Sequence, residues 1–265
     1  MQWVAEVGAV TGRSLAYVGG LAELSGRSLR LLILSPLKRR RMLQRAIHEA
    51  MAAGVGAIPI VSLISFFVGV IIALQGAYEL QRLGAMQLVS SLVAIAITRE
   101  LGPLITAIVV IGRSGSAFAA EIGTMRVTEE LDALSTMALD PVAFLVVPKF
   151  LAMALMLPCL SLWADLMGIL GGSLFGVAAG GYSFGGYLLA TRDALLLRDI
   201  SSGIIKSLVF GIVITAVGCQ EGFATGSGAE EVGRSTTSAV VISILMVILI
   251  DLIFTALFYV ARGGN

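Results

Sequence analysis

The sequence predicts an all-α integral membrane protein with an N-terminal amphipathic interfacial helix, five transmembrane helices, and a short cytoplasmic helix between spans two and three. Of its 265 residues, 57% are hydrophobic and only 13% are charged, a composition that is rare in soluble domains. Several apolar runs reach the roughly 20 residues that a bilayer crossing needs. A basic cluster precedes the first run: Arg27, Arg30, Lys38, Arg39, Arg40, Arg41 and Arg45.

The N-terminal region is predicted to lie on the membrane rather than cross it. Residues 1–48 form an interfacial and cytoplasmic region, and residues 49–265 the transmembrane region, of one domain. Apolar residues recur at helical spacing among charged ones in 1–35. Glu6 and Glu23 interrupt this stretch, so a signal peptide is not expected. Ser35-Pro36 should end the helix, and the basic residues after it place the N-terminus in the cytoplasm.

Five spans follow, which puts the C-terminus on the outer side of the membrane. They are expected at 57–79, 88–118, within 144–182, at 202–219 and at 239–261. Polar connections are expected at 183–199 and 220–238. The 144–182 stretch is too long for one crossing, so two crossings stay open there. Lys149 is expected at the cytoplasmic interface, and the glycine-rich end of the stretch should allow close helix packing.

Span two carries two adjacent ionisable residues, Arg99 and Glu100. Charges inside a span are costly and usually face a partner or a cavity. They could contact the head group of an amphipathic ligand, or form a structural pair at the membrane edge. Pro103 follows and predicts a bend, because it removes a backbone donor and its ring crowds the preceding turn.

Residues 128–137 predict a short cytoplasmic helix that binds a partner, together with Glu121. Thr128 is expected to cap the helix, and two acidic residues suit the positive end of its first turn. Leu131, Leu134 and Met137 give one apolar stripe, which can seat in a groove of another protein. A solvated connector is the alternative. The acidic residues of the first turn are Glu129 and Glu130.

Spans four and five contain one charge each, Lys206 and Asp251. These could pair between helices or take part in transport, and the sequence leaves both open. Cys159 and Cys219 both lie in apolar runs, which predicts two inert buried thiols rather than a disulfide.

The sequence argues against an enzyme with its own cofactor. None of the three lysines follows a glycine, so no P-loop is present. If transport is driven by ATP, the ATPase must be another chain. No His, Cys and carboxylate cluster has the spacing of a metal site. The run Gly112-Arg113-Ser114-Gly115 lacks a histidine base within the membrane, which favours tight helix packing over protease chemistry. A net charge of +1 gives no general attraction to nucleic acid.

Two motifs resemble those of MlaE/YrbE-type permeases. They are RELGPLITAIVVIGRSGSAFAAEIGTMRVTEELDAL (99–134), followed by Asp140-Pro141, and GAEEVGRSTTSAVV (228–241). The resemblance implies an ABC transporter permease in the inner membrane of a double-membraned bacterium. It would move phospholipids between the inner and outer membranes and maintain outer-membrane lipid asymmetry. Implied partners are a second copy of the chain, a cytoplasmic ATPase that binds ATP and Mg²⁺, a periplasmic MCE-domain lipid-binding protein and a small STAS-domain protein.

The resemblance also implies roles for single residues. Residues 128–137 would be the coupling helix. The lipid cavity would draw on span one and on the Arg99-Glu100 pair, and Lys206 and Asp251 match charged positions of the family. The span-one residues are Leu74, Gln75 and Tyr78. Two other classes stay open: an ion-coupled secondary transporter that uses Lys206 and Asp251, and a non-transporting scaffold for envelope proteins.

Overall fold

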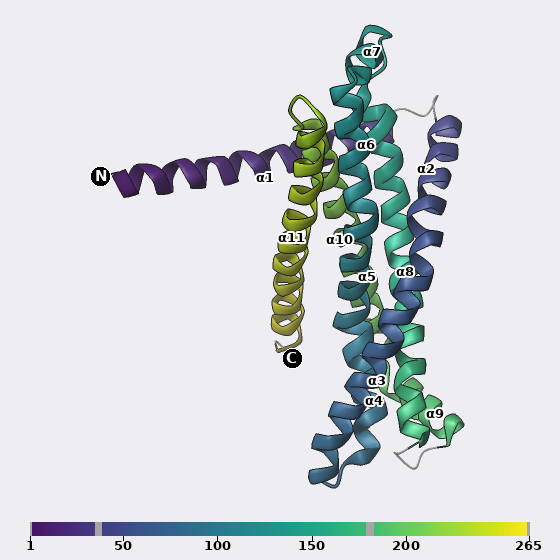
Figure 1. The fold of residues 1–265 in the computed structure, drawn as a ribbon. Helices are drawn as coiled ribbons and strands as arrows, with labels where there is room; N and C mark the ends of the chain where they lie inside the picture. Colours follow the sequence, from purple (N-terminus) through teal and green to yellow (C-terminus); the bar gives the residue numbers. More distant parts are fainter. Residues whose placement is uncertain (1, 35–38, 179–182, 264–265) are drawn as a thin grey trace.

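The computed structural model describes residues 2–34, 39–178 and 183–263, which form helices and short connections (Figure 1). No strand occurs in these three ranges. Five helical segments are long and apolar enough to cross a membrane. They are Met42–Arg82, Met86–Val127, Val142–Ala178, Leu197–Phe223 and Ala229–Val260. The predicted all-helical class with five spanning segments is therefore confirmed.

The first spanning segment is longer than the apolar run that predicted it. It joins α2 (Arg39–Gly54), a 3₁₀ turn (Val55–Ala57) and α3 (Ile58–Arg82) without a loop. Pro59 lies in the first turn of α3, where its missing N–H costs no helical hydrogen bond. The boundary predicted between residues 48 and 49 falls inside α2, which packs along α8 (Val147–Ala178).

The second spanning segment contains two π-helical turns. It runs through a 3₁₀ turn (Met86–Leu88), α4 (Val89–Ala96), a π turn (Ile97–Leu101), α5 (Gly102–Val110), a π turn (Ile111–Gly115) and α6 (Ser116–Val127). Its 42 residues correspond to about 63 Å of helix at 1.5 Å per residue, about twice the hydrocarbon core. The segment therefore projects from the membrane, and α6 leads to α7 at one end of the bundle (Figure 1).

The first π turn is the structure's response to Pro103. Proline cannot donate the hydrogen bond that an α-helix needs at this point. The N–H of Gly102 instead reaches the carbonyl of Ile97, one residue further back than in an α-helix. The irregularity that the sequence placed at Pro103 is therefore a π turn just before it, and Arg99 and Glu100 lie within this turn.

The third spanning segment is one continuous helix. A π turn (Val142–Val146) leads into α8, which ends at Ala178. After residues 179–182, which are outside the described part, α9 (Phe184–Ala194) has 11 residues, too few to cross a bilayer. The stretch therefore crosses once, and most of the connection predicted at 183–199 is helical. The hydroxyl of Ser183 caps α9 by accepting a hydrogen bond from the N–H of Gly186 at 3.1 Å.

Glycines bring α3 and α8 into backbone contact. A Cβ added at Gly69 would overlap the carbonyl oxygen of Gly168, and one added at Gly171 would overlap that of Phe66. Such close approach needs residues without side chains. The predicted packing role is confirmed for Gly168, Gly171, Gly172 and Gly176, whereas Gly180 and Gly181 lie outside the described residues.

The last two spans are α10 (Leu197–Phe223) and α11 (Ala229–Gly263). Only residues 224–228 separate them, so the polar connection predicted at 220–238 is mostly helix. The prediction took these polar residues for a loop. Glu230 and Glu231 instead lie in the first turn of α11, where acidic side chains complement the helix dipole. Helix α11 lies at the edge of the bundle (Figure 1) and is the least buried span.

Two predictions about small side chains hold only in part. In the second π turn, Ser114 and Gly115 are buried, and a Cβ added at Gly218 of α10 would lie 2.8 Å from the carbonyl oxygen of Gly115. Gly112 faces open space instead.

Cys219 is buried as predicted, but Cys159 is exposed on the outer side of α8. An apolar run does not distinguish a residue facing lipid from one facing the bundle, which explains the error.

Helix α1 (Gln2–Leu34) extends sideways from the bundle, nearly at right angles to the spanning helices (Figure 1). It is anchored near the end of the bundle that carries α7. The amide of Gln220 donates to the carbonyl of Tyr17 at 3.2 Å, and Arg27 forms an ion pair with Asp140 at 3.0 Å. Burial, with a smaller effect of the Glu221 carboxylate, raises the pKa of Tyr17, so the phenol stays neutral. The break predicted at Ser35-Pro36 lies outside the described residues.

Candidate functional site

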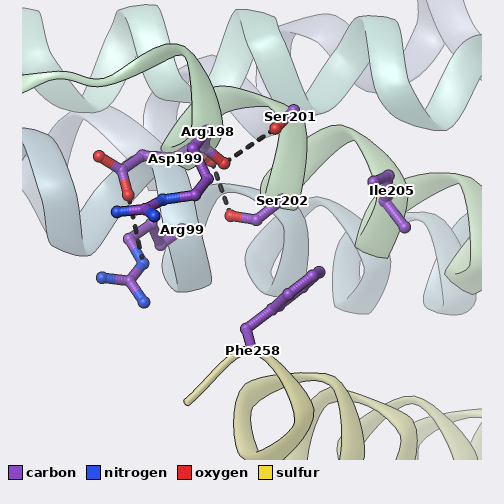
Figure 2. Close-up of a pocket in the computed structure, with 7 residues that line it drawn as sticks. All are labelled: Arg99, Arg198, Asp199, Ser201, Ser202, Ile205 and Phe258. Atoms are coloured by element: carbon purple, nitrogen blue, oxygen red, sulfur yellow. Dashed lines mark hydrogen bonds and ion pairs between the residues drawn. The ribbon is translucent and has the colours of Figure 1, made fainter. Parts of the chain in front are cut away.

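A small pocket of about 120 Å³ lies where α10 begins (Figure 2). The first turns of α10 supply most of its lining, the π turn of span two supplies Arg99, and α11 supplies Phe258. The complete lining is Arg99, Arg198, Asp199, Ser201, Ser202, Ile205 and Phe258. The pocket thus combines two guanidinium groups and two hydroxyls with the apolar side chains of Ile205 and Phe258.

Asp199 organises the polar part of this pocket. Its carboxylate accepts a hydrogen bond from the N–H of Leu196 at 3.2 Å, which satisfies the start of α10. The same carboxylate lies 3.7 Å from Nε of Arg99 and is almost fully buried. Arg198 stays exposed, and the hydroxyls of Ser201 and Ser202 donate to the carbonyls of Arg198 and Asp199.

The electrostatics of the pocket favour an anion. Two cationic side chains face one carboxylate, and the N-terminus of the 27-residue helix α10 adds partial positive charge. Guanidinium groups bind phosphate oxygens well because their donors match the geometry of the anion. The pocket can therefore hold a small anionic group beside an apolar segment.

A second polar cluster lies next to the pocket and joins three spans. Lys206 of α10 forms ion pairs with Glu100 of the π turn and, at 2.9 Å, with Asp251 of α11. The ammonium also donates to the hydroxyl of Thr255 at 2.8 Å, and that hydroxyl donates to Glu100 at 3.2 Å. Lys206 is almost completely buried. We call Glu100, Lys206, Asp251 and Thr255 the Lys206 network.

Of the two alternatives left open by the sequence, the Lys206 network shows the pairing of Lys206 with Asp251, and it adds two members. Glu100 was predicted to bind lipid together with Arg99, but adjacent residues on a helix point in different directions. Arg99 consequently lines the pocket, whereas Glu100 turns to Lys206. Thr255 was missed, although it lies four residues after Asp251 and therefore on the same face of α11.

The predicted lipid-binding residues of span one lie elsewhere. Leu74, Gln75 and Tyr78 line an open hollow of about 500 Å³ with Glu79, all on α3. The ring of Tyr78 also packs under the guanidinium of Arg82 at 4.4 Å. This hollow and the pocket share no lining residue. Within one chain, the structure therefore does not bring the five predicted lipid-binding residues into one site.

A second buried lysine, Lys149, joins α8 to α2 and α6 by ion pairs. Lys149 of α8 forms ion pairs with Glu49 of α2 and Glu121 of α6, both at 2.7 Å, and lies 4.7 Å from the ring centre of Phe118. Its side chain is buried between helices, and its depth relative to the membrane surface, predicted to be the cytoplasmic interface, stays a prediction. The sequence did not indicate the two ion pairs because the partners lie 28 and 100 residues away.

The short helix α7 (Glu130–Thr136) projects from the end of span two (Figure 1). Its N-cap residue is Glu129, at a left-handed φ of 60°, rather than Thr128. Thr128 instead ends α6, and its hydroxyl donates back to the carbonyl of Thr124 at 3.0 Å. The capping prediction failed because a β-branched hydroxyl residue satisfies α6 equally well.

The apolar stripe predicted on α7 is divided between two faces. Leu131 and Leu134 are buried in a core cluster of this chain with Ile122 and Val146. Met137 is 63% exposed. The two leucines therefore attach α7 to its own bundle, and the outward-facing side chains of α7 are acidic, hydroxyl-bearing or small. The exposed acidic residues are Glu130 and Asp132 of α7 and its N-cap residue Glu129.

The described ranges contain no group of three or more His, Cys, Asp or Glu side chains that could hold a metal ion. The arrangement is that of a polytopic membrane protein with five spanning helices, ion networks buried between them, and a small amphipathic pocket. A family model described as "Permease MlaE" matches residues 46–257. The chain therefore belongs to the MlaE permease family of ABC transporter permeases.

Three curated relatives match between 78% and 96% of the chain. A "probable ABC transporter permease protein" of Rickettsia conorii is 37% identical over 253 residues, 96% of each chain. The chloroplastic protein TRIGALACTOSYLDIACYLGLYCEROL 1 of Arabidopsis thaliana is 37% identical over 88% of this chain and 67% of its own length. The "intermembrane phospholipid transport system permease protein MlaE" of Haemophilus influenzae is 36% identical over 78% of this chain and 79% of its own.

Proposed function

We propose that this chain is the membrane subunit of an ATP-driven transporter that moves phospholipids between the inner and outer membranes of a double-membraned bacterium, and so maintains lipid asymmetry. The pocket at the start of α10 carries this proposal. A phospholipid has an anionic phosphate next to apolar chains, and the pocket places Arg99 and Arg198 beside Ile205 and Phe258. The name of the Haemophilus relative, which specifies phospholipid transport, also supports the proposal.

The proposal assigns successive parts of the lipid to successive surfaces. The phosphate binds Arg99 and Arg198, with help from the N–H groups at the start of α10. Acyl chains extend past Phe258 toward the outer surface of α11, which is largely exposed and apolar. The hollow at Leu74, Gln75 and Tyr78 offers a second contact surface. Two copies of the chain complete the cavity in a homodimer.

The energy source is a separate cytoplasmic ATPase, which binds ATP and Mg²⁺ and docks on α7. The exposed acidic residues of α7 and Met137 form the docking surface, and Leu131 and Leu134 transmit its movement into the bundle. Glu121, through Lys149, extends this connection to α2 and α8. The ATPase can drive the permease only if it binds one conformation of α7 more tightly than another.

The proposed docking of a cytoplasmic ATPase on α7 also determines the proposed orientation of the chain in the membrane. The end of the bundle with α7 faces the cytoplasm of the inner membrane, and α1 lies along the cytoplasmic membrane surface. The opposite end, with α9 and the α3–α4 turn (Figure 1), faces the periplasm. There it meets an MCE-domain lipid-binding protein. A small STAS-domain protein binds the assembly on the cytoplasmic side.

Mass spectrometry of lipids that copurify with the intact complex tests the lipid assignment. Wild-type protein should retain phospholipid, and the double variant Arg99→Gln, Arg198→Gln should lose most of it. Arg192→Gln is the matched control, since Arg192 is exposed on α9 and does not line the pocket. Equal phospholipid retention by the double variant and the control would refute the headgroup site.

A further inference from the structure

Asp165 is a carboxylate in the middle of span three that no basic side chain neutralises within the part of the chain that the structure describes. It lies on α8 and is only 7% exposed. Its Oδ1 atom is fully buried without a hydrogen-bond partner. Among the described residues, no Lys, Arg or His lies within ion-pair distance of Asp165, which distinguishes it from the carboxylates of the Lys206 network.

The carboxyl group packs directly on a glycine of span two. A Cβ added at Gly102 would overlap Oδ1 of Asp165. Gly102 is the first residue of α5 and closes the π turn that contains Arg99 and Glu100. The position of the Asp165 carboxyl is therefore coupled sterically to the turn that supplies one residue to the pocket and one to the Lys206 network.

No charged group on the neighbouring helices pairs with Asp165 among the described residues. Helices α4 and α5 contain no ionisable residue, and α3 contains none before Tyr78. Arg99 pairs with Asp199, and Lys206 with Glu100 and Asp251. The other described titratable groups of the helices packed on α8 are Tyr17, Glu23, Arg27, Arg30, Arg45, His48, Glu49, Tyr78, Glu79, Arg82, Tyr187, Arg192, Asp193, Arg198, Cys219 and Glu221.

An isolated carboxylate in such a place is unfavourable. Burial away from water penalises the ionised form, and a group without a counter-charge takes up a proton instead. Within a membrane span the penalty is not relieved by bulk water, so an ionisable residue there must find a partner or become neutral. Gly102, on which the carboxyl group packs, has no side chain and therefore no side-chain N–H or O–H that could stabilise an anion.

We propose that Asp165 is a proton-binding site, occupied in this conformation, and that the neutral acid positions the π turn of span two. The ligand is a proton from solvent, and binding it removes the charge that would otherwise separate α5 from α8. Release of the proton drives the carboxylate toward water and moves Gly102, and with it Arg99 and Glu100. Asp165 is thus a positioning residue for the pocket rather than a group that touches the lipid.

Infrared spectroscopy of the purified full-length chain in phosphatidylcholine vesicles tests the proton directly. At neutral pH, where surface carboxyls are ionised, wild type minus Asp165→Asn should show the carbonyl band of an un-ionised carboxylic acid. The matched control Asp193→Asn, at an exposed aspartate of α9, should not remove this band. Dicyclohexylcarbodiimide, which adds a protonated carboxyl across its C=N bond, should modify Asp165 in wild type, as read by peptide mass spectrometry.

An ionised Asp165 at neutral pH, or a carboxylate whose band depends on added Na⁺, would overturn the proposal. The pH profile tests the positioning role. The thermal stability of wild type should fall as pH rises from about 4, where an aspartate of the unfolded chain loses its proton, through neutral, because the packed bundle retains this proton over that range. Asp165→Asn should lack this component of the pH profile. Parallel profiles for both proteins would contradict the role. Neither measurement uses transport, so both are independent of the proposed function.

Discussion

Replacing Lys206 by methionine should destabilise the protein far more than the loss of one surface charge. Lys206 is almost fully buried and neutralises Glu100 and Asp251 while bonding Thr255 at 2.8 Å. Methionine fills a similar volume but leaves two carboxylates facing each other without a cation. The cost therefore comes from unpaired buried charge and not from lost packing.

The expected magnitude follows from the exposure of the two carboxylates. Removing one partner of a buried ion pair typically costs about 3–5 kcal/mol. The side chain of Asp251 is 17% exposed and that of Glu100 is 35% exposed, so solvent relieves part of the penalty. We therefore expect about 3 kcal/mol, the lower end of that range, or about a hundredfold in the unfolding constant.

Reversible unfolding in mixed micelles with increasing dodecyl sulfate provides the measurement, followed by circular dichroism. Labelling of the buried Cys219 in a Cys159→Ala background gives a second probe, because Cys159 is exposed. Coincident transitions from both probes support a two-state analysis. The control is Arg234→Met, which removes an exposed i,i+3 pair with Glu231 at 3.7 Å. Such surface pairs contribute about 0–1 kcal/mol.

A neutral version of the network separates charge from shape. The triple variant Glu100→Gln, Lys206→Met, Asp251→Asn contains no unpaired charge and should recover most of the lost stability, since neutral replacement of a buried ion network is commonly tolerated. The reasoning is refuted if Lys206→Met is no less stable than the Arg234→Met control. It also fails if the triple variant is as unstable as the single one.

Three further predictions concern packing and docking. Gly69→Leu should prevent stable packing of α3 on α8, with a loss of about 3 kcal/mol or more in the free energy of unfolding. The control Gly185→Leu should fold normally, because Gly185 faces open space. Equal stability of the two variants would refute the glycine contact. Leu134→Ala should cost about 2–3 kcal/mol, toward the lower end of the range for buried leucine, and the exposed Met137→Ala less than about 0.5 kcal/mol, measured by the same unfolding assay. Charge reversal by Glu129→Lys with Asp132→Lys should abolish copurification of the ATPase without loss of stability, while Glu79→Lys at the opposite end should not; retained copurification would exclude α7 as the docking surface.

Hydrophobicity and motifs were sufficient to predict the fold class, the number of spans and the family. Span positions were correct to within the apolar core of each helix. The ends of the predicted spans were wrong by up to 15 residues. Charged residues in α2 and at the start of α11 concealed the true ends of these helices, because only the packed structure shows which charges are buried and which face outward. The π turns were also missed, although Pro103 marked the position of the first one.

Residues of the candidate site could be predicted only where a single apolar run already showed an unusual charge. The sequence identified the adjacent Arg99 and Glu100 and the single charges Lys206 and Asp251 in apolar runs, and the structure places all four in polar contacts. It could not assign partners that lie a hundred residues away, such as Glu49 for Lys149. Nor could it separate Glu100 from Arg99, since their directions depend on the π turn.

ATP-driven transfer of a labelled phospholipid out of proteoliposomes tests the central claim most directly. The chain is reconstituted alone and together with its ATPase and the periplasmic lipid-binding protein. We predict transfer only with the ATPase and ATP, and its loss in the Arg99→Gln, Arg198→Gln variant. Transfer by the chain alone, driven by an ion gradient without any ATPase, would contradict the permease assignment and favour a secondary transporter.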